Sequence, residues 1–374
     1  ENGIVVPSGA VGALRDAFMR MIDRSPDDLI AMGETSRRKY NELASLSTHR
    51  RELGELFARK IADGPAKLSS TKERAGTIAA SPRAPDIPRG KQQIIVSLTS
   101  FPPRMPTIAT CIESLKHQTK QPDQILLWLS EDQFPERTAN LPVELRALID
   151  RQFQIRWVKG DLAPHKKYFY AMREFPNAIV VTVDDDVRYD KDLIAALYQG
   201  HLDCPLSVVA GRSNFIRFRQ DGTLRTYDQW GYDHQHLREA ETFALLPTGI
   251  GGILYPPGSV PVEAFDIGAI EATCLHADDL WLKVMTAANG YPVWMPQRKF
   301  DYRNIDGSQE AALWRGNAFQ NGNDLAMGSI LKFLEQKYGI ADSILRRMQG
   351  VREDGTFVGP GDEVDRSPLL VAKS

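Results

Sequence analysis

Three consecutive aspartates, Asp184 to Asp186, directly follow the apolar run AIVVTV. A short, continuous apolar run predicts a buried strand, and successive strand side chains point to opposite faces. If the strand continues through the aspartates, Asp184 and Asp186 share one side and Asp185 points to the other. Two neighbouring carboxylates favour a hard cation between them, and all-oxygen ligands favour Mg²⁺ or Mn²⁺. The run therefore predicts a metal and diphosphate site, with an acidic turn that caps the next helix as the alternative.

A second acidic pair, Asp278 and Asp279, precedes the amphipathic stretch LWLKVMTAANG. The helix dipole stabilises carboxylates in the first turn of a helix by roughly 0.3 to 1 kcal/mol, so capping alone is one explanation of the pair. The presence of the aspartate run favours a second explanation, in which both acidic groups belong to one site.

Polar and basic residues in two other segments are candidates for binding phosphate or nucleotide. Thr99, Ser100 and Arg104 lie in SLTSFPPRM, after the first predicted strand, where wound sheets commonly hold nucleotides. Lys166 and Lys167 lie just before a predicted helix in APHKKYFYAM, where a lysine could neutralise phosphate. The alternative for this lysine pair is a solvated surface position.

A glycine cluster and an aromatic loop are candidates for contacts with a sugar or acceptor. In LPTGIGGILYPPG, the cluster of Gly249, Gly251 and Gly252 would let a ligand approach the backbone, although such glycines equally mark a tight turn. The run TYDQWGYDHQH contains Trp230 and Tyr232, and its mixture of aromatic and polar groups suits stacking on sugar faces. The alternative is a packed surface loop.

The elements that must position these residues follow from the pattern of the chain. From Gln92 onward, short Ile/Val/Leu runs alternate with helical stretches. Strands that are apolar throughout are buried on both faces, which predicts an α/β fold with a mixed, mainly parallel sheet flanked by helices. Ligands of such sheets bind at the carboxyl ends of the strands, which is where we expect the candidate residues to lie.

Composition divides the chain into four segments. Residues 1–65 have helical apolar spacing, and residues 66–91 are rich in Ser, Ala and Pro, as linkers are. Residues 92–340 carry the alternating pattern, whereas residues 341–374 are charged and rich in Gly and Pro, which predicts a partly ordered tail. Because the chain opens on Glu-Asn-Gly without a leader, we expect it to be cut from a longer polypeptide.

Charge and hydropathy exclude several classes of function. The chain has 374 residues, 42% of them hydrophobic, and 46 Lys and Arg against 48 Asp and Glu. This balance argues against nucleic acid as a partner, and no apolar run approaches the roughly 18 to 20 residues of a membrane span. Three widely spaced cysteines suggest neither a disulfide framework nor a zinc site. We therefore expect the protein in the cytoplasm or at the inner face of the cytoplasmic membrane.

Five motifs in order, VSLTSFPPRM, PHKKYFYAM, AIVVTVDDDV, PTGIGG and a late ADD, resemble a bacterial GT-A-fold glycosyltransferase of the family 2 type. The aspartate triplet is similar to the DxD element of that family, which implies that Asp184 and Asp186 hold the ribose and the metal-bound diphosphate of a nucleotide sugar. The resemblance also implies a UDP-sugar as the donor, Mn²⁺ or Mg²⁺ as the cofactor, and a glycan or lipid-linked saccharide as the acceptor.

The late ADD is similar to the acidic position of inverting members of that family. This implies that Asp279 is the base that deprotonates the acceptor hydroxyl and that Asp278 is its neighbour, although His276 and Ala277 depart from the common Glu-Asp form. Residues 1–65 resemble the C-terminal end of a GT-B glycosyltransferase of family 4. Together the two resemblances imply a multi-domain enzyme of bacterial surface polysaccharide synthesis, with upstream domains or other assembly proteins as partners.

Two other functions compete with a glycosyltransferase. A nucleotidyltransferase on a similar sheet would use metal-bound aspartates to attack an α-phosphate, but its glycine-rich and basic first loop is missing here. A non-catalytic scaffold of an assembly complex would not need the DDD and ADD elements, which are both intact.

Overall fold

The computed structural model describes residues 92–232, 237–300, 303–307, 322–351, 358, 362 and 364–370. The chain divides into two compact units, Glu1–Arg83 and Ala84–Ser374, and every described residue belongs to the second. The predicted helical segment 1–65 and the predicted linker 66–91 lie outside the described residues, so both remain predictions.

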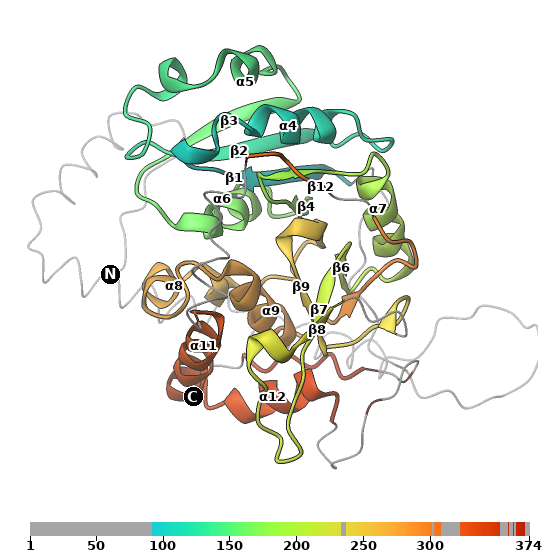
Figure 1. Ribbon diagram of the computed structural model, residues 1–374. Coiled ribbons are helices and arrows are strands. Elements are labelled where there is room, and N and C mark those ends of the chain that lie inside the picture. Colours follow the sequence, from blue (N-terminus) through green and yellow to red (C-terminus); the bar gives the residue numbers. More distant parts are fainter. Residues whose placement is uncertain are drawn as a thin grey trace, which may run out of the picture. The chain divides into compact units, whose positions relative to one another are not determined.

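A seven-stranded sheet forms the centre of the described part (Figure 1). In spatial order its strands are β11 (Val293–Trp294), β6 (Val208–Ala210), β10 (Ile253–Tyr255), β4 (Ile179–Thr182), β1 (Ile94–Thr99), β2 (Gln124–Ser130) and β3 (Phe153–Val158). The strands from β4 to β3 are parallel, β11 is parallel to β6, and β10 is antiparallel to both of its neighbours. The predicted α/β class with a mixed, mainly parallel sheet is therefore confirmed.

Helices flank this sheet. They are α4 (Ile108–Lys116), α5 (Val143–Ala147), α6 (Lys166–Glu174), α7 (Leu193–Asp203), α8 (Ile267–Thr273), α9 (Asp278–Ala288), α11 (Gly322–Tyr338) and α12 (Ala341–Gln349). Short 3₁₀ turns connect several elements: η1 (Pro102–Arg104), η2 (Arg137–Asn140), η3 (Ala163–His165), η4 (Tyr227–Gln229), η6 (Gly249–Gly251) and η7 (Val262–Phe265).

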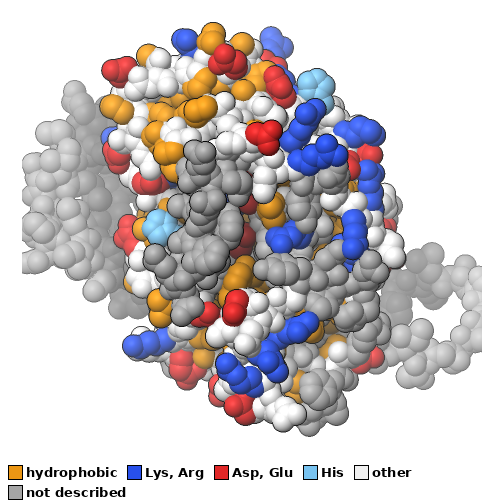
Figure 2. Space-filling view, in the orientation of Figure 1, with side chains coloured by type: hydrophobic (Ala, Val, Ile, Leu, Met, Phe, Trp, Pro, Cys, Tyr) orange, Lys and Arg blue, Asp and Glu red, His pale blue; other side chains and the backbone are white. Residues whose placement is uncertain are grey.

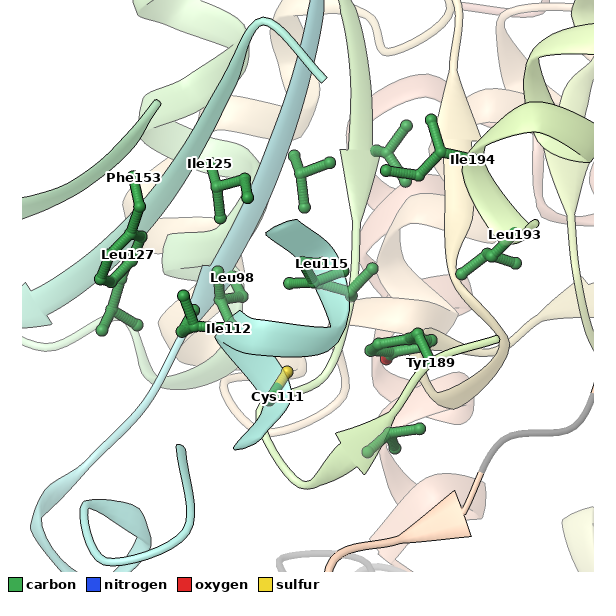
Figure 3. Close-up of a cluster of buried hydrophobic side chains, with 14 of the residues drawn as sticks. Leu98, Cys111, Ile112, Leu115, Ile125, Leu127, Phe153, Tyr189, Leu193 and Ile194 are labelled. Atoms are coloured by element: carbon green, nitrogen blue, oxygen red, sulfur yellow. The ribbon is translucent and has the colours of Figure 1, made fainter. Parts of the chain in front are cut away.

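The strands bury both faces because alternate side chains point to opposite sides. Val96 and Leu98 of β1 belong to a core cluster with α4 and α7, part of which Figure 3 shows. Ile95, which directly precedes Val96, belongs to a separate cluster with Ala171 of α6. A third cluster, around the fully buried Trp281 of α9, packs α8, α11 and α12 together.

Part of the segment predicted as a partly ordered tail is helical. It begins with α12, whose Ile344 and Met348 are buried in the same cluster as Trp281. The spacing of four residues places these two side chains on one face of the helix, which explains how a mostly polar segment packs on the core. Over the described residues, no helix is long and apolar enough to cross a membrane.

Two small antiparallel sheets adjoin the main one. The first contains β8 (Gly231–Tyr232), β7 (Ser213–Phe215) and β9 (Leu245–Pro247), in that order. The second pairs β5 (Val187–Arg188) with β12 (Arg303–Asn304). β5 follows the aspartate run and β9 precedes η6, so both small sheets border the carboxyl end of β4.

Candidate active site

The aspartate run lies at the carboxyl end of β4, but it does not continue the strand. β4 ends at Thr182, and Asp185 and Asp186 form a turn before β5. The predicted alternation of the three side chains is therefore wrong. Asp185 and Asp186 instead both contact the guanidinium group of the buried Arg104. Its Nη1 lies 3.6 Å from Asp185 Oδ1 and 2.7 Å from Asp186 Oδ2.

The loop after β1 carries two residues that contact the aspartate run, as its place in the sequence predicts. η1 at the end of this loop carries Arg104, and Ser100 Oγ donates a hydrogen bond of 2.5 Å to Asp185 Oδ2. Burial raises the pKa of Asp185 to about 6, although Arg104 and Ser100 act in the opposite direction. Thr99 is turned to the neighbouring strand, where its hydroxyl donates to the carbonyl of Trp128.

Lys167 joins the aspartate run to the second acidic pair. Its Nζ lies 2.8 Å from Asp184 Oδ1 and 3.0 Å from Asp278 Oδ2. Lys167 is in the first turn of α6, and Asp278 opens α9, so the contact connects two helices at the end of the sheet. Burial lowers the pKa of Lys167, but the surrounding carboxylates outweigh this effect and raise it well above its ordinary value. Lys167 is therefore a fixed positive charge at neutral pH.

Asp279 has the properties of a proton acceptor. Its Oδ2 accepts a hydrogen bond of 3.1 Å from the Gly249 backbone N–H, whereas its buried Oδ1 has no hydrogen-bond partner among the described residues. Burial and the neighbouring charge of Asp278 raise the pKa of Asp279 to about 7. A carboxylate with a pKa near the working pH and one oxygen available is suited to general base catalysis.

Gly249, which belongs to the predicted glycine cluster, and Tyr189, which was not predicted, complete the site. A side chain at Gly249 would place its Cβ 2.8 Å from Lys167 Nζ and closer still to Asp184 Oδ1, so any other residue there would displace these two charged groups. The Tyr189 hydroxyl accepts a hydrogen bond of 2.8 Å from the Asp184 N–H and donates one of 3.2 Å to the Gly249 carbonyl. The glycine cluster was a signal for Gly249, while the sequence holds no comparable signal for Tyr189.

The other two glycines of this cluster were also predicted to face a ligand, but they instead allow close packing of the chain. A Cβ at Gly251 would lie 2.5 Å from the backbone nitrogen of Arg212. Gly252 has a φ of +71°, which favours glycine, and its Cβ position is filled by Leu193. The absence of their side chains is therefore explained by the turn itself, and the glycine that faces the acidic groups is Gly249.

Other predicted residues lie apart from the acidic groups. Lys166, although adjacent to Lys167, is buried in an ion pair with Asp161. Trp230 is 3% exposed and its indole N–H donates to the Arg225 carbonyl, so its ring is part of the core and is covered from a sugar. The backbone of Tyr232 pairs with β7 in the small sheet.

The carboxylates at this site fit a hard divalent cation that is shared with a substrate. Among the described residues, no group of three His, Cys, Asp or Glu side chains could hold a metal by itself. Magnesium, however, is commonly bound by one or two carboxylates together with substrate phosphates and water. The side chain of Asp184 is 32% exposed and that of Asp186 is 14% exposed, so both are accessible to such an ion.

No family model matches this sequence, and no curated protein matches it either. Among solved structures, the chain is similar to S. aureus TarS residues 1–349 in complex with UDP-GlcNAc, with 13% identity and a TM-score of 0.41 over 69% of this chain and 72% of that one. It is also similar to the UDP-glucose pyrophosphorylase from Acinetobacter baumanii, with 9% identity and a TM-score of 0.37 over 66% and 99% of the two chains. A third similar structure is the mannosyltransferase PcManGT from Pyrobaculum calidifontis in complex with GDP-Man and Mn²⁺, with 14% identity and a TM-score of 0.34 over 57% and 56%.

Proposed function

We propose that this protein is a glycosyltransferase that moves a sugar from a nucleotide-sugar donor to a hydroxyl group of a saccharide or lipid-linked glycan. One observation carries the proposal: Lys167 holds a donor-side carboxylate, Asp184, and an acceptor-side carboxylate, Asp278, in one cluster next to Asp279. The cluster lies at the carboxyl end of the sheet, where wound sheets bind nucleotides. A transferase of this class needs a polar diphosphate site and a proton acceptor side by side.

The donor side of the proposed site contains Ser100, Arg104, Lys167 and the aspartate run. Arg104 and Lys167 are buried cations that each contact carboxylates, so they set the positions of the acids that would meet the ribose and the diphosphate. Asp184 and Asp186 would hold a Mn²⁺ or Mg²⁺ ion. When bound, that ion supplies positive charge to the oxygens of the departing diphosphate.

On the acceptor side, Asp279 would act as the general base. The acceptor oxygen attacks the anomeric carbon, its proton passes to Oδ1 of Asp279, and the bond from that carbon to the diphosphate oxygen breaks. The products are a glycoside and a nucleoside diphosphate. Because a single displacement occurs at one carbon, the anomeric configuration inverts. The Gly249 N–H supports this role by holding the other carboxylate oxygen in place.

The proposal is tested by incubating the full chain with a panel of UDP- and GDP-sugars and Mn²⁺ and measuring which phosphate product forms. A glycosyltransferase releases a nucleoside diphosphate, through slow hydrolysis without an acceptor and through transfer with one. A parallel incubation with a nucleoside triphosphate and a sugar phosphate tests the alternative, and release of pyrophosphate there would establish a nucleotidyltransferase. Binding of no nucleotide sugar would support a scaffold.

The matched variants are Asp279→Asn and Asp150→Asn. Both substitutions remove one carboxylate charge. Asp150, however, lies at the surface in an ion pair with Lys116. It belongs to another loop and is distant in sequence from the acidic cluster. We expect Asp279→Asn to lower transfer by about 10² to 10⁴ while donor binding persists, since this is the usual contribution of a general base. Asp150→Asn should retain full activity. Equal activity of the two variants would contradict the role of Asp279.

A further inference from the structure

A hairpin that extends from the small sheet carries a concentration of arginines. After β7, residues 216–226 fold back on themselves, with Phe218 and Leu224 bridged in antiparallel orientation and the Arg225 N–H bonded to the Arg217 carbonyl at 2.9 Å. In Figure 1 this hairpin reaches away from the main sheet, near α12. Figure 2 shows Lys and Arg side chains on the visible face in that lower region.

The two faces of the hairpin differ sharply. Phe218 and Leu224 pack against the core cluster around α9, whereas Arg217, Arg219 and Arg225 are exposed. This follows from the alternation of strand side chains: Arg217 and Arg225 are opposite each other, and Arg219 is two residues further along the same face. The result is a surface of three guanidinium groups, which we call the arginine face.

The arginine face has one nearby carboxylate within the hairpin, the exposed Asp221 at its turn, whose charge interacts with that of Arg219. Among the described residues, none of its three arginines forms an ion pair with a carboxylate. Arg219 and Arg225 donate to backbone carbonyls of Leu224 and Phe218 instead, which orients their guanidinium groups. Like charges directly opposite each other destabilise a strand pair. The positive charges of the three arginines therefore repel one another, although the net charge of the whole chain is only -2.

The hairpin is connected to the proposed active site through β7. Ser213 of β7 is paired with Pro247 of β9, and Pro247 is followed by Thr248 and Gly249. Arg217 is four residues beyond Ser213, so it lies about 13 Å further along an extended strand. An extended chain that occupies the active site with one end could therefore reach the arginine face with its next units.

We propose that the arginine face binds an anionic saccharide acceptor, one whose repeating units carry carboxylate or phosphate groups. The inference rests on the proposed glycosyltransferase function and names the class of its acceptor. Guanidinium groups recognise carboxylate and phosphate oxygens through paired hydrogen bonds, and they do so better than lysines. An anionic membrane surface is less well matched, because interfacial segments also insert apolar side chains and the hairpin has none among the exposed large hydrophobic residues.

The test uses direct binding by the full chain, so that it does not depend on turnover. One variant combines Arg217→Gln, Arg219→Gln and Arg225→Gln. The matched control removes three exposed positive charges at the other end of the molecule, by Arg146→Gln, Arg151→Gln and Lys159→Gln on α5 and next to β3. The probes are polygalacturonate, which carries carboxylates, polyphosphate, neutral dextran, and vesicles of phosphatidylglycerol, each titrated at low and high salt.

We expect the wild type and the control to bind polygalacturonate or polyphosphate in a salt-sensitive manner, and the hairpin variant to bind about tenfold more weakly, as the sum of three exposed ion pairs. Dextran should not bind. Equal binding by the hairpin variant and the control, or no binding of either polyanion, would overturn the inference. The inference would also be overturned if the wild type bound only the vesicles and the hairpin variant did not bind them. That result would assign the arginine face to a membrane. Donor hydrolysis is measured in parallel, and its absence in the wild type would refute the function rather than the arginine face.

Discussion

The elevated pKa of Asp279 predicts that the folded protein becomes less stable when this carboxyl group ionises. An Asp side chain has an ordinary value of 3.8, and burial raises this carboxyl to about 7. The folded state therefore favours the protonated form. The corresponding contribution to stability is fully present below pH 4 and is lost as the pH rises through about 7, because the unfolded chain releases the proton first.

The size of the effect follows from the shift. A change of about 3 pKa units corresponds to about 4 kcal/mol in the free energy of unfolding, which is an upper limit because the charges of Asp278 and Lys167 also act on this carboxyl. Asp279→Asn preserves the shape of the side chain and does not ionise. At pH 8 the variant should therefore be more stable than the wild type, by up to about 4 kcal/mol. At pH 4 the two should differ little.

The measurement is urea unfolding of both proteins at several pH values between 4 and 8, together with the pH dependence of kcat/KM. We expect the stability difference to grow with pH and the kcat/KM of the wild type to fall below about pH 7, where Asp279 becomes protonated. A variant that is less stable than the wild type at pH 8 would refute the account of Asp279 as a buried, raised carboxylate. A flat pH profile of kcat/KM would refute its role as the base.

Three further predictions follow from other contacts. Gly249→Ala should displace the Asp184 carboxylate and reduce transfer at least about tenfold, with a cost of roughly 1 to 3 kcal/mol in stability, which kinetics and calorimetry together would check. Arg104→Gln should destabilise the fold by roughly 3 to 5 kcal/mol at pH 8 and by less at pH 5, because it leaves two half-buried carboxylates without this buried cation. Urea unfolding at the two pH values checks this, and an unchanged stability would contradict it. Lys283→Met should raise the melting temperature at neutral pH. Burial lowers the pKa of this fully buried lysine to about 7, and its side-chain nitrogen lacks a hydrogen-bond partner among the described residues. A lower melting temperature of the variant would contradict this.

Much of the fold could be predicted from the sequence because the relevant signals are local. The continuous apolar runs identify β1, β2 and β4 without knowledge of their neighbours, since strands buried on both faces need no alternation. The acidic residues were found for the same reason. Asp184 follows a strand and Asp279 lies in the first turn of a helix, and both positions can be read from the adjoining apolar pattern.

The alternation expected for the aspartate run does not occur, because the strand is followed by a turn. β4 ends before the run, and a turn at Asp185 and Asp186 brings both side chains to Arg104. An apolar run shows where a strand is buried, but it does not show where the strand ends when polar residues follow. After the turn, β5 pairs with β12, a strand that is distant in sequence.

The sequence alone determined the class of the fold, the end of the sheet at which the polar residues gather, and the acidic groups themselves, because these depend on local apolar patterns and on general rules of parallel sheets. Only the tertiary structure decided which neighbours share the site. Adjacent residues of a helix point about 100° apart, so the packing of α6 on the sheet turns Lys167 to the acids and Lys166 to Asp161. The contacts of Gly249 and Tyr189 likewise join segments far apart in the chain, and no local pattern can encode a distance between them.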